Sequence, residues 1–465
     1  MRRGAAPVAG ASAARTAFSS AALARCLRLL VGSLAGSRLC VAYSGGLDST
    51  ALLVAAAGLR ARYRCQVRAV HVNHHLQPGA GAMAAAARVA ARRLGVACKV
   101  VNAPVSIARG ESPEAAARVT RYAALRRELQ GGEWLLLAQH QDDQVEALLL
   151  QLLRGAGVAG LAAMARRAGP MLRPLLDVSR GQLRDYLRRR SITWTEDPSN
   201  ADERFGRNFL RLRVLPLLRE RWPGLGATIS RSAALAAEGQ ELLAARAEAQ
   251  LRNAHDGAAL SVSALRRLSD LDRRNALRHW LEGRGLPMPD QRRLQEIAGP
   301  MLQARHDAQP FIHWPGGLVR RHGGLLHAIV PTTAAPATES PVASALAWDW
   351  LRESRRALPG GACLELRDDA RGPLLRSALP DRVRVAFRAA DGTVAGLPGG
   401  RRLKRRLQAG PLPPWQRRSV PLLYAGRRLL AVGVWWHAPE LTAGAATRTA
   451  KRCRLVWRPA GGAFI

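Results

Sequence analysis

The sequence predicts an α/β fold with a doubly wound parallel sheet, followed by a helical domain and a small α+β domain. In roughly the first 200 residues, apolar runs of about five residues alternate with helix-forming stretches of about 12 or more, a pattern typical of parallel sheets covered by helices. Beyond residue 226 the apolar residues first recur at helical spacing and later alternate as in strands.

The strands of the predicted sheet are short and apolar. We expect them at 38–42, 67–72, 97–101 and 134–138, with further segments near Leu172 and Ile192. Helices are expected between them at 48–59, 80–94, 114–129 and 142–153. Each helix would connect two parallel strands, since such strands need a long crossover.

The length of 465 residues is enough for several domains. We expect a disordered N-terminal extension at 1–20, a catalytic domain at 21–225 and a helical domain at 226–330. A Pro-, Thr- and Ala-rich linker at 331–345 would precede a C-terminal α+β domain at 346–465. The extension is similar in composition to an organelle transit peptide, but an unstructured start or a misplaced initiator also explains it.

The formal net charge of +37 favours a polyanionic partner. Nearly all basic residues are arginine, so an arginine-biased genome is an alternative explanation. The number of acidic residues is not correspondingly high, however, which favours the polyanionic partner. No stretch of about 18 uncharged apolar residues occurs, so we expect no membrane segment. The six cysteines form no Cys-x-x-Cys pair. This argues against zinc and iron–sulfur sites and fits a reducing, cytoplasmic location.

A glycine-containing loop follows the first predicted strand. It consists of Ser44, Gly45, Gly46, Leu47, Asp48 and Ser49, and it opens a helix. Two glycines let the backbone present several N–H groups to one anion, and a helix N-terminus adds positive potential. Phosphate is the natural occupant, and an aspartate beside it implies a Mg²⁺ ion between them. The loop lacks the Gly-Lys pair of a Walker A motif; an ordinary strand-to-helix turn is the alternative.

Three further groups are candidates for binding. Arg118 and Arg121 share a helical face and could neutralise phosphate, or form a solvated arginine face. A polar cluster directly after a buried strand could bind a cation or an amine, or could simply favour the helix dipole; its members are His140, Asp142, Asp143 and Glu146. Arg207 and Arg211 share a face, which makes phosphate binding plausible but unspecific.

Taken together, these motifs resemble those of the tRNA(Ile)-lysidine synthetases, a family of the PP-loop ATP pyrophosphatase superfamily. The matching segments are 41–52, 71–74, 114–122, 140–146, 153–161, 173–176, 196–200, 207–208, 403–405 and 413–417. Two positions depart from the family pattern, because Ala147 stands where threonine is usual and Asn73 where aspartate is commoner. Ala147 removes a hydroxyl next to the acidic cluster, and Asn73 removes a charge. Neither position lies in the glycine loop.

The resemblance implies a PP-loop, or adenine nucleotide α-hydrolase-like, sheet and an ATP-dependent ligase. Its substrates would be ATP with Mg²⁺, free L-lysine and the isoleucine tRNA with a CAU anticodon, whose wobble cytidine is adenylated and then converted to lysidine. The resemblance assigns ATP to the loop 44–49 and Mg²⁺ to Asp48. Catalytic roles are expected for Asp48, Arg118 and Asp143, and substrate contacts for Arg121, His140, Asp142, Glu146 and Arg207.

Other functions compete with this one. A PP-loop tRNA thiolase commonly uses cysteine chemistry, which the unpaired cysteines disfavour. A GMP or NAD synthetase would not need so basic a C-terminal region, and an RNA-binding protein with a degenerate loop would not need Asp48 and both glycines. The helical and C-terminal domains are expected to bind tRNA. Whether the chain forms a homodimer stays open.

Overall fold

The computed structural model describes residues 17–74, 79–105, 113–196, 202–256, 259–305, 307–330, 345–389, 393–394, 396–410, 412–442 and 450–458. The chain forms two compact units, Met1–Leu242 and Leu243–Ile465. Residues 1–16 of the predicted extension and 331–344 of the predicted linker lie outside the described residues. Among those that are described, no helix is both long and apolar enough to cross a membrane.

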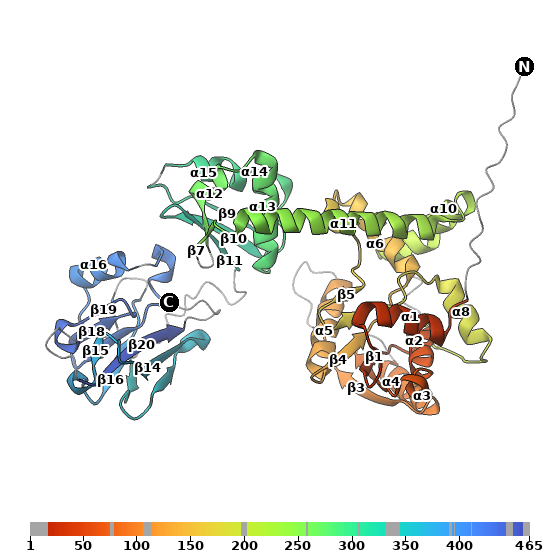
Figure 1. Cartoon of the computed structure of the whole chain (residues 1–465), viewed down its shortest axis with the longest axis horizontal. Helices are drawn as coiled ribbons and strands as arrows, with labels where there is room; N and C mark the ends of the chain where they lie inside the picture. The colour runs from red at the N-terminus through yellow and green to blue at the C-terminus, as the bar shows by residue number, and fades with distance from the viewer. Residues whose placement is uncertain are drawn as a thin grey trace, which may run out of the picture. The chain divides into compact units, whose positions relative to one another are not determined.

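The first unit is built on a six-stranded sheet with the order β3-β2-β1-β4-β6-β5. Figure 1 labels β1, β3, β4 and β5 of this sheet. The strands are β1 Arg38–Ala42, β2 Gln66–Asn73, β3 Ala97–Asn102, β4 Glu133–Leu136, β5 Arg167–Ala168 and β6 Met171–Leu172. Every pairing is parallel except that of β5 with β6. The predicted parallel layer is therefore confirmed.

One predicted strand does not form. The segment around Ile192 has no strand geometry, while the segment at Leu172 does form β6. The backbone N–H of Thr195 donates to the carbonyl of Gly45 at 3.0 Å. The segment is thus bonded to the glycine loop and not to an edge of the sheet, which an apolar pattern alone could not reveal.

Helices cover both faces of this sheet. The elements are α1 Ser20–Val31, α2 Leu47–Ala57, α3 Arg60–Tyr63, α4 Ala80–Arg93, α5 Pro113–Glu128, α6 Gln141–Leu153, α7 Val158–Leu161 and α8 Arg180–Arg188. Side chains alternate along β1 as expected for a strand: Leu39 and Val41 join the core formed with α1, α2 and α8, whereas Cys40 joins a smaller core with Leu125 of α5. This alternation is what makes the sheet doubly wound.

The end of the first unit is helical. It comprises α9 Gly206–Phe209, a π-helical turn η2 Leu210–Val214 and α10 Leu215–Arg221, after which the long helix α11 spans Leu225–Leu251. The π-helical turn carries Arg211, one of three arginines that contact the acidic cluster, as shown below, and such turns often occur at functional sites.

The second unit contains two cores. The first joins α12 Val262–Arg266, α13 Asp270–Gly283, α14 Gln291–Ala298 and α15 Pro300–Gln303 to an antiparallel sheet of β7 His255–Asp256, β8 Ala259–Ser261, β9 Phe311–Trp314, β10 Gly317–His322 and β11 Leu325–Ile329. The helical content was predicted, but this sheet was missed. Two of its strands have only two or three residues, which is too short for a readable alternation.

The second core belongs to the C-terminal α+β domain, as predicted. One sheet consists of β12 Leu346–Trp348, β16 Val383–Ala386, β17 Leu422–Ala425, β18 Arg428–Val432 and β19 Trp436–His437. The other consists of β13 Arg355–Ala357, β14 Cys363–Asp368, β20 Arg452–Arg458 and β15 Leu374–Leu375. The helix is α16 Arg401–Ala409, and short 3₁₀ turns are η3 Pro359–Gly361, η4 Arg376–Ala378, η5 Pro414–Gln416 and η6 Pro439–Leu441. Trp348, Trp350 and Trp457 are each about fully buried in this core.

Candidate active site

The glycine loop lies at the carboxyl end of the central strand. β1 pairs with β2 on one side and with β4 on the other, so the strand order reverses here. Open α/β sheets bind ligands at such a reversal, because the connections leave to opposite faces and a crevice remains. Gly45 has φ of 87°, a left-handed conformation that favours glycine. The loop therefore has both the place and the backbone of a ligand-binding turn.

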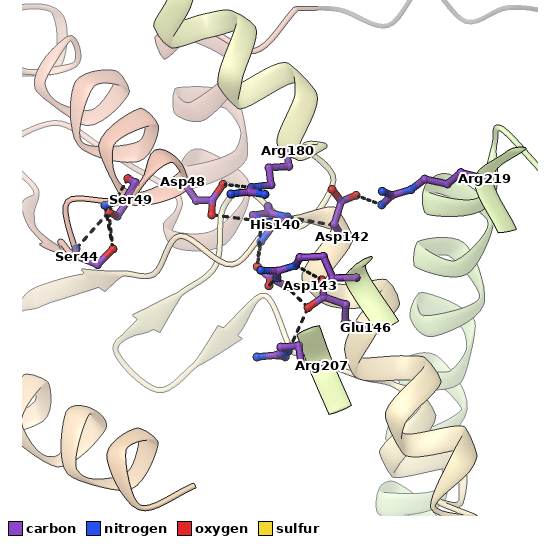
Figure 2. Close-up of polar contacts among 12 residues, drawn as sticks. Ser44, Asp48, Ser49, His140, Asp142, Asp143, Glu146, Arg180, Arg207 and Arg219 are labelled. Carbon is purple, nitrogen blue, oxygen red and sulfur yellow. Dashed lines mark hydrogen bonds and ion pairs between the residues drawn. The ribbon is translucent and has the colours of Figure 1, made fainter. Parts of the chain in front are cut away.

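Hydroxyl groups hold the shape of this loop. The N–H of Ser44 donates to Ser49 Oγ at 3.2 Å, and Ser49 Oγ donates to the carbonyl of Gly46 at 3.1 Å (Figure 2). Thr50 Oγ1 donates to the carbonyl of Gly45 at 3.3 Å. Ser49 and Thr50 are buried, so their hydroxyls act mainly to fix the loop at the N-terminus of α2.

Asp48, in the first turn of α2, points away from these serines toward two cationic side chains (Figure 2). Its Oδ2 lies 3.5 Å from His140 Nε2, and its Oδ1 lies 3.8 Å from Arg180 Nε. Burial alone would raise the pKa of Asp48, but the hydrogen bond and charge of His140, with help from Arg180 and Arg211, lower it below its usual value. Asp48 is thus a carboxylate at neutral pH.

The surroundings of Asp48 fit a nucleotide-bound Mg²⁺ ion. Its Oδ1 is buried and has no hydrogen-bond partner among the described residues. Within the same residues, no group of three or more His, Cys, Asp or Glu side chains could hold a metal by itself. Mg²⁺ in ATP sites commonly takes one or two carboxylates and fills its remaining positions with phosphate oxygens and water. One carboxylate oxygen that accepts no hydrogen bond, next to the glycine loop, meets that requirement.

His140 connects the loop to the acidic cluster. It caps α6, with Nδ1 accepting from the N–H of Asp142 at 3.2 Å, and its Nε2 lies 3.5 Å from both Asp48 and Asp143. Burial lowers the pKa of His140, but the carboxylates of Asp143, Asp48 and Asp142 outweigh it and raise the pKa to about 9. When Nδ1 is protonated, it can no longer accept the hydrogen bond from the N–H of Asp142. The charged ring is then held by its attraction to these carboxylates. The ring is only 1% exposed, so a substrate cannot reach it. His140 therefore acts by holding the neighbouring side chains in position.

Arginines of the segment 206–221 neutralise the acidic cluster. The fully buried Glu146 accepts from Arg211 Nε at 2.7 Å and Nη2 at 3.0 Å, and it also pairs with Arg207 Nε at 3.2 Å. Burial raises the pKa of Glu146 in spite of these arginines. Arg211 Nη2 also reaches Asp143 Oδ1 at 3.4 Å. Asp143 and Glu146 therefore belong to one network through Arg211, and Asp142 joins it by the hydrogen bond of its N–H to His140.

Asp142 and Asp143 are the accessible members of this network. Asp142 pairs with Arg219 of α10 at 2.8 Å. The side chains of Asp142 and Asp143 are 16% and 15% exposed, in contrast to 0% for Glu146. A substrate amine could therefore reach these two aspartates more readily than it could reach Glu146.

The predicted arginines of α5 lie apart from this network. Arg118 is exposed and stacks over the ring of Tyr122 at 5.3 Å, which agrees with their sharing one helical face. Arg121 is also exposed. Burial lowers the pKa of His74, directly after β2, and the charge of Arg121 adds to this lowering. No ion pair or hydrogen bond joins Arg118 to Asp48 or to the acidic cluster within the described residues.

Arg180 and Arg219 are members of the site that the sequence did not predict. Arg180 is the first residue of α8, and Arg219 lies in α10. Neither belongs to a motif with a recognisable spacing, and many other arginines surround them in the sequence. Only the fold brings them to Asp48 and Asp142.

Models of protein families match three parts of the chain. A PP-loop domain matches residues 20–218, the TilS substrate binding domain matches 260–327, and the TilS substrate C-terminal domain matches 383–457. The PP-loop match covers the six-stranded sheet and the network described above, with the exception of Arg219.

Curated relatives match over most of their length. A tRNA(Ile)-lysidine synthase of Alkalilimnicola ehrlichii is 41% identical over 87% of this chain and 91% of the relative. Those of Methylococcus capsulatus and Coxiella burnetii are 39% and 37% identical, over 89% and 87% of this chain and 95% and 90% of the relatives. A solved U34-tRNA thiolase from Methanococcus maripaludis is more remote, with 15% identity and a TM-score of 0.38 over 46% of this chain and 76% of that one.

Proposed function

Because this chain belongs to the tRNA(Ile)-lysidine synthase family and is an ATP-dependent ligase, we propose that it joins lysine to C2 of the wobble cytidine in the isoleucine tRNA with a CAU anticodon. The observation that carries the proposal is the contact chain from Asp48 through His140 to Asp143. It puts a phosphate loop and an accessible acidic cluster side by side at one edge of the sheet.

The first step of the proposed reaction prepares a leaving group. The O2 oxygen of the cytidine attacks the α-phosphorus of ATP, the bond to the β-phosphate oxygen breaks, and pyrophosphate leaves. In the second step the side-chain amine of lysine attacks C2, the C2–O2 bond breaks, and AMP departs with the oxygen. Adenylation is needed because the original carbonyl oxygen is a poor leaving group.

The loop 44–49 would bind the phosphates of ATP through its backbone N–H groups and the positive end of α2. Asp48 would hold Mg²⁺ by its unpartnered Oδ1, and the ion would offset the charge of the pyrophosphate. The exposed Arg118 and Arg121 on α5 would add positive charge for phosphate, either of ATP or of the tRNA.

Asp142 and Asp143 would receive the lysine side chain. Its ammonium must lose a proton before the nitrogen can attack, and a neighbouring carboxylate can accept that proton. We assign this role to Asp143 because its side chain is partly exposed and is linked to Asp48 through His140. Glu146 and Arg207 would act indirectly, by fixing the position of Arg211.

The proposal is tested by following labelled lysine into RNA. The intact chain is incubated with ATP, Mg²⁺, labelled lysine and the CAU-anticodon tRNA, with a tRNA that carries another anticodon as control. Label should enter only the CAU-anticodon tRNA, with one AMP formed per lysine. If folded protein transfers no label, the lysidine proposal fails. ATP turnover that depends on a sulfur donor would favour the thiolase alternative.

A further inference from the structure

Arg180 is a cationic side chain beside the phosphate loop that no motif accounts for. Figure 2 shows it extending from the start of α8 toward Asp48 and His140. Its side chain is 41% exposed, and its Nε lies 3.8 Å from Asp48 Oδ1, which is longer than a hydrogen bond. Arg180 and Asp48 thus face each other without forming a direct hydrogen bond.

The atoms on both sides of this gap lack partners. Arg180 Nε and Asp48 Oδ1 are both buried, and neither has a hydrogen-bond partner among the described residues. Buried polar atoms are nearly always bonded, so an unpartnered pair calls for an explanation such as a missing ligand. By contrast, Arg211 in the neighbouring network makes two hydrogen bonds to Glu146.

The position of Arg180 is fixed by its helix. Ser179 caps α8: the N–H of Gln182 donates to Ser179 Oγ at 3.3 Å, and Gln182 Oε1 accepts from the N–H of Ser179 at 2.9 Å. Leu183 and Leu187 of α8 are fully buried in the same core as α2. The helix that carries Arg180 is therefore held firmly against the helix that carries Asp48.

We propose that Arg180 is a substrate-contacting residue that binds the β- and γ-phosphates of ATP, the part that leaves as pyrophosphate. Its guanidinium provides several donors in a planar array that suits phosphate oxygens. In the absence of nucleotide, the charge of Asp48 holds the guanidinium of Arg180 next to the loop 44–49. When the guanidinium turns to phosphate, Asp48 Oδ1 is left for the metal ion. This inference rests on the proposed use of ATP at the loop.

A purely structural role for Arg180 makes a different prediction. If Arg180 served only to keep Asp48 in place, its loss would disturb the whole loop and weaken every nucleotide ligand. If it binds the β- and γ-phosphates, its loss should weaken only ligands that carry them. Adenosine, which lacks phosphate, separates the two cases.

The experiment measures the binding of three probes to the intact chain in Mg²⁺: α,β-methylene-ATP, pyrophosphate and adenosine. Arg180→Ala and Arg180→Lys are compared with the wild type, and Arg184→Ala is the matched control because Arg184 is an exposed residue of the same helix. Arg180→Ala should raise Kd at least about tenfold for the nucleotide analogue and for pyrophosphate. Kd for adenosine should stay within about twofold, Arg180→Lys should recover part of the loss, and Arg184→Ala should match the wild type.

Each contrary result has a distinct meaning. Unchanged binding of α,β-methylene-ATP by Arg180→Ala, or an equal loss for adenosine, would overturn the role of Arg180 and leave the proposed function intact. Failure of the wild type to bind the nucleotide analogue would instead contradict the use of ATP at this loop. Retained adenosine binding also shows that the variant is folded.

Discussion

At the scale of single residues, Asp48 is held as a carboxylate by two cationic neighbours. His140 Nε2 faces one of its oxygens at 3.5 Å, and Arg180 faces the other at 3.8 Å. The lowered pKa of Asp48 follows from this arrangement in spite of its burial. A charge held in this way suits the proposed role of Asp48 as a metal ligand.

Replacing Asp48 should separate chemistry from RNA binding. In Asp48→Ala the adenylation step, measured as pyrophosphate release in the presence of tRNA, should be abolished. Affinity for tRNA, measured by filter binding, should stay nearly intact, because phosphate contacts elsewhere carry it. Asp185→Ala, at an exposed position of α8, is the control. Loss of both properties in Asp48→Ala would indicate a structural role for Asp48.

His140 should make stability depend on pH above neutrality. Its pKa is raised from 6.5 to about 9 in the folded chain, so the folded state holds the proton more tightly than the unfolded state does. The resulting stabilisation is complete below about pH 6.5 and is lost as the pH rises through about 9. The urea midpoint of the wild type should fall over this window, and that of His140→Gln should fall less. Parallel curves would contradict this assignment.

At the scale of elements, three ion pairs join the segment 206–221 to α6. Arg207, Arg211 and Arg219 pair with Glu146, Asp143 and Asp142 across the two elements. Leu210 and Leu215 of the same segment are buried, whereas Phe209, Leu212 and Leu217 are exposed. The arginines therefore act together with two buried leucines in holding this segment.

Breaking the most buried of these pairs should be costly. Arg211→Met leaves Glu146 buried beside one remaining arginine, and loss of a partner from a buried pair destabilises by about 3–5 kcal/mol. Urea denaturation should show a loss of this order, and adding Glu146→Gln should recover part of it. Arg213→Met in the same π-helical turn is the matched control. Its pair with Glu203 is exposed, so the change should cost less than about 1 kcal/mol. Equal losses for Arg211 and Arg213 would contradict the buried network.

At the scale of the whole molecule, the net charge of +37 has two explanations that salt can separate. If the charge binds RNA phosphates, log Kd for tRNA should rise steeply with log salt, as expected when about 6–10 contacts release counterions. If it reflects only genome composition, the dependence should be shallow. Binding of tRNA measured between about 50 and 200 mM salt decides between them.

Helix α16 is a place to look for these contacts. Arg402, Lys404 and Arg405 are exposed, whereas Leu403 and Leu407 are buried on the opposite face. Replacing the three basic residues by alanine should reduce the slope of log Kd against log salt by up to about three. An unchanged slope would place the RNA contacts elsewhere.

The parts of the fold that were predictable are those with local causes. The strand β1, the helix that follows the glycine loop and the helix α6 follow from neighbouring residues, and they form where expected. Contacts made by tertiary structure were not predictable. Arg180 reaches Asp48 because α8 packs against α2, and the segment at Ile192 bonds to the loop instead of forming a strand.

The central position of β1 affects which parts of the molecule unfold first. Its backbone is bonded on both sides, and Leu39, Cys40 and Val41 are almost fully buried. Amides in such a strand exchange with solvent only when the whole sheet comes apart, whereas chain ends and surface segments exchange through small local openings. The glycine loop 44–49 is therefore anchored to a segment that is among the last to lose its structure. Brief fraying elsewhere in the chain would leave the proposed ATP site intact.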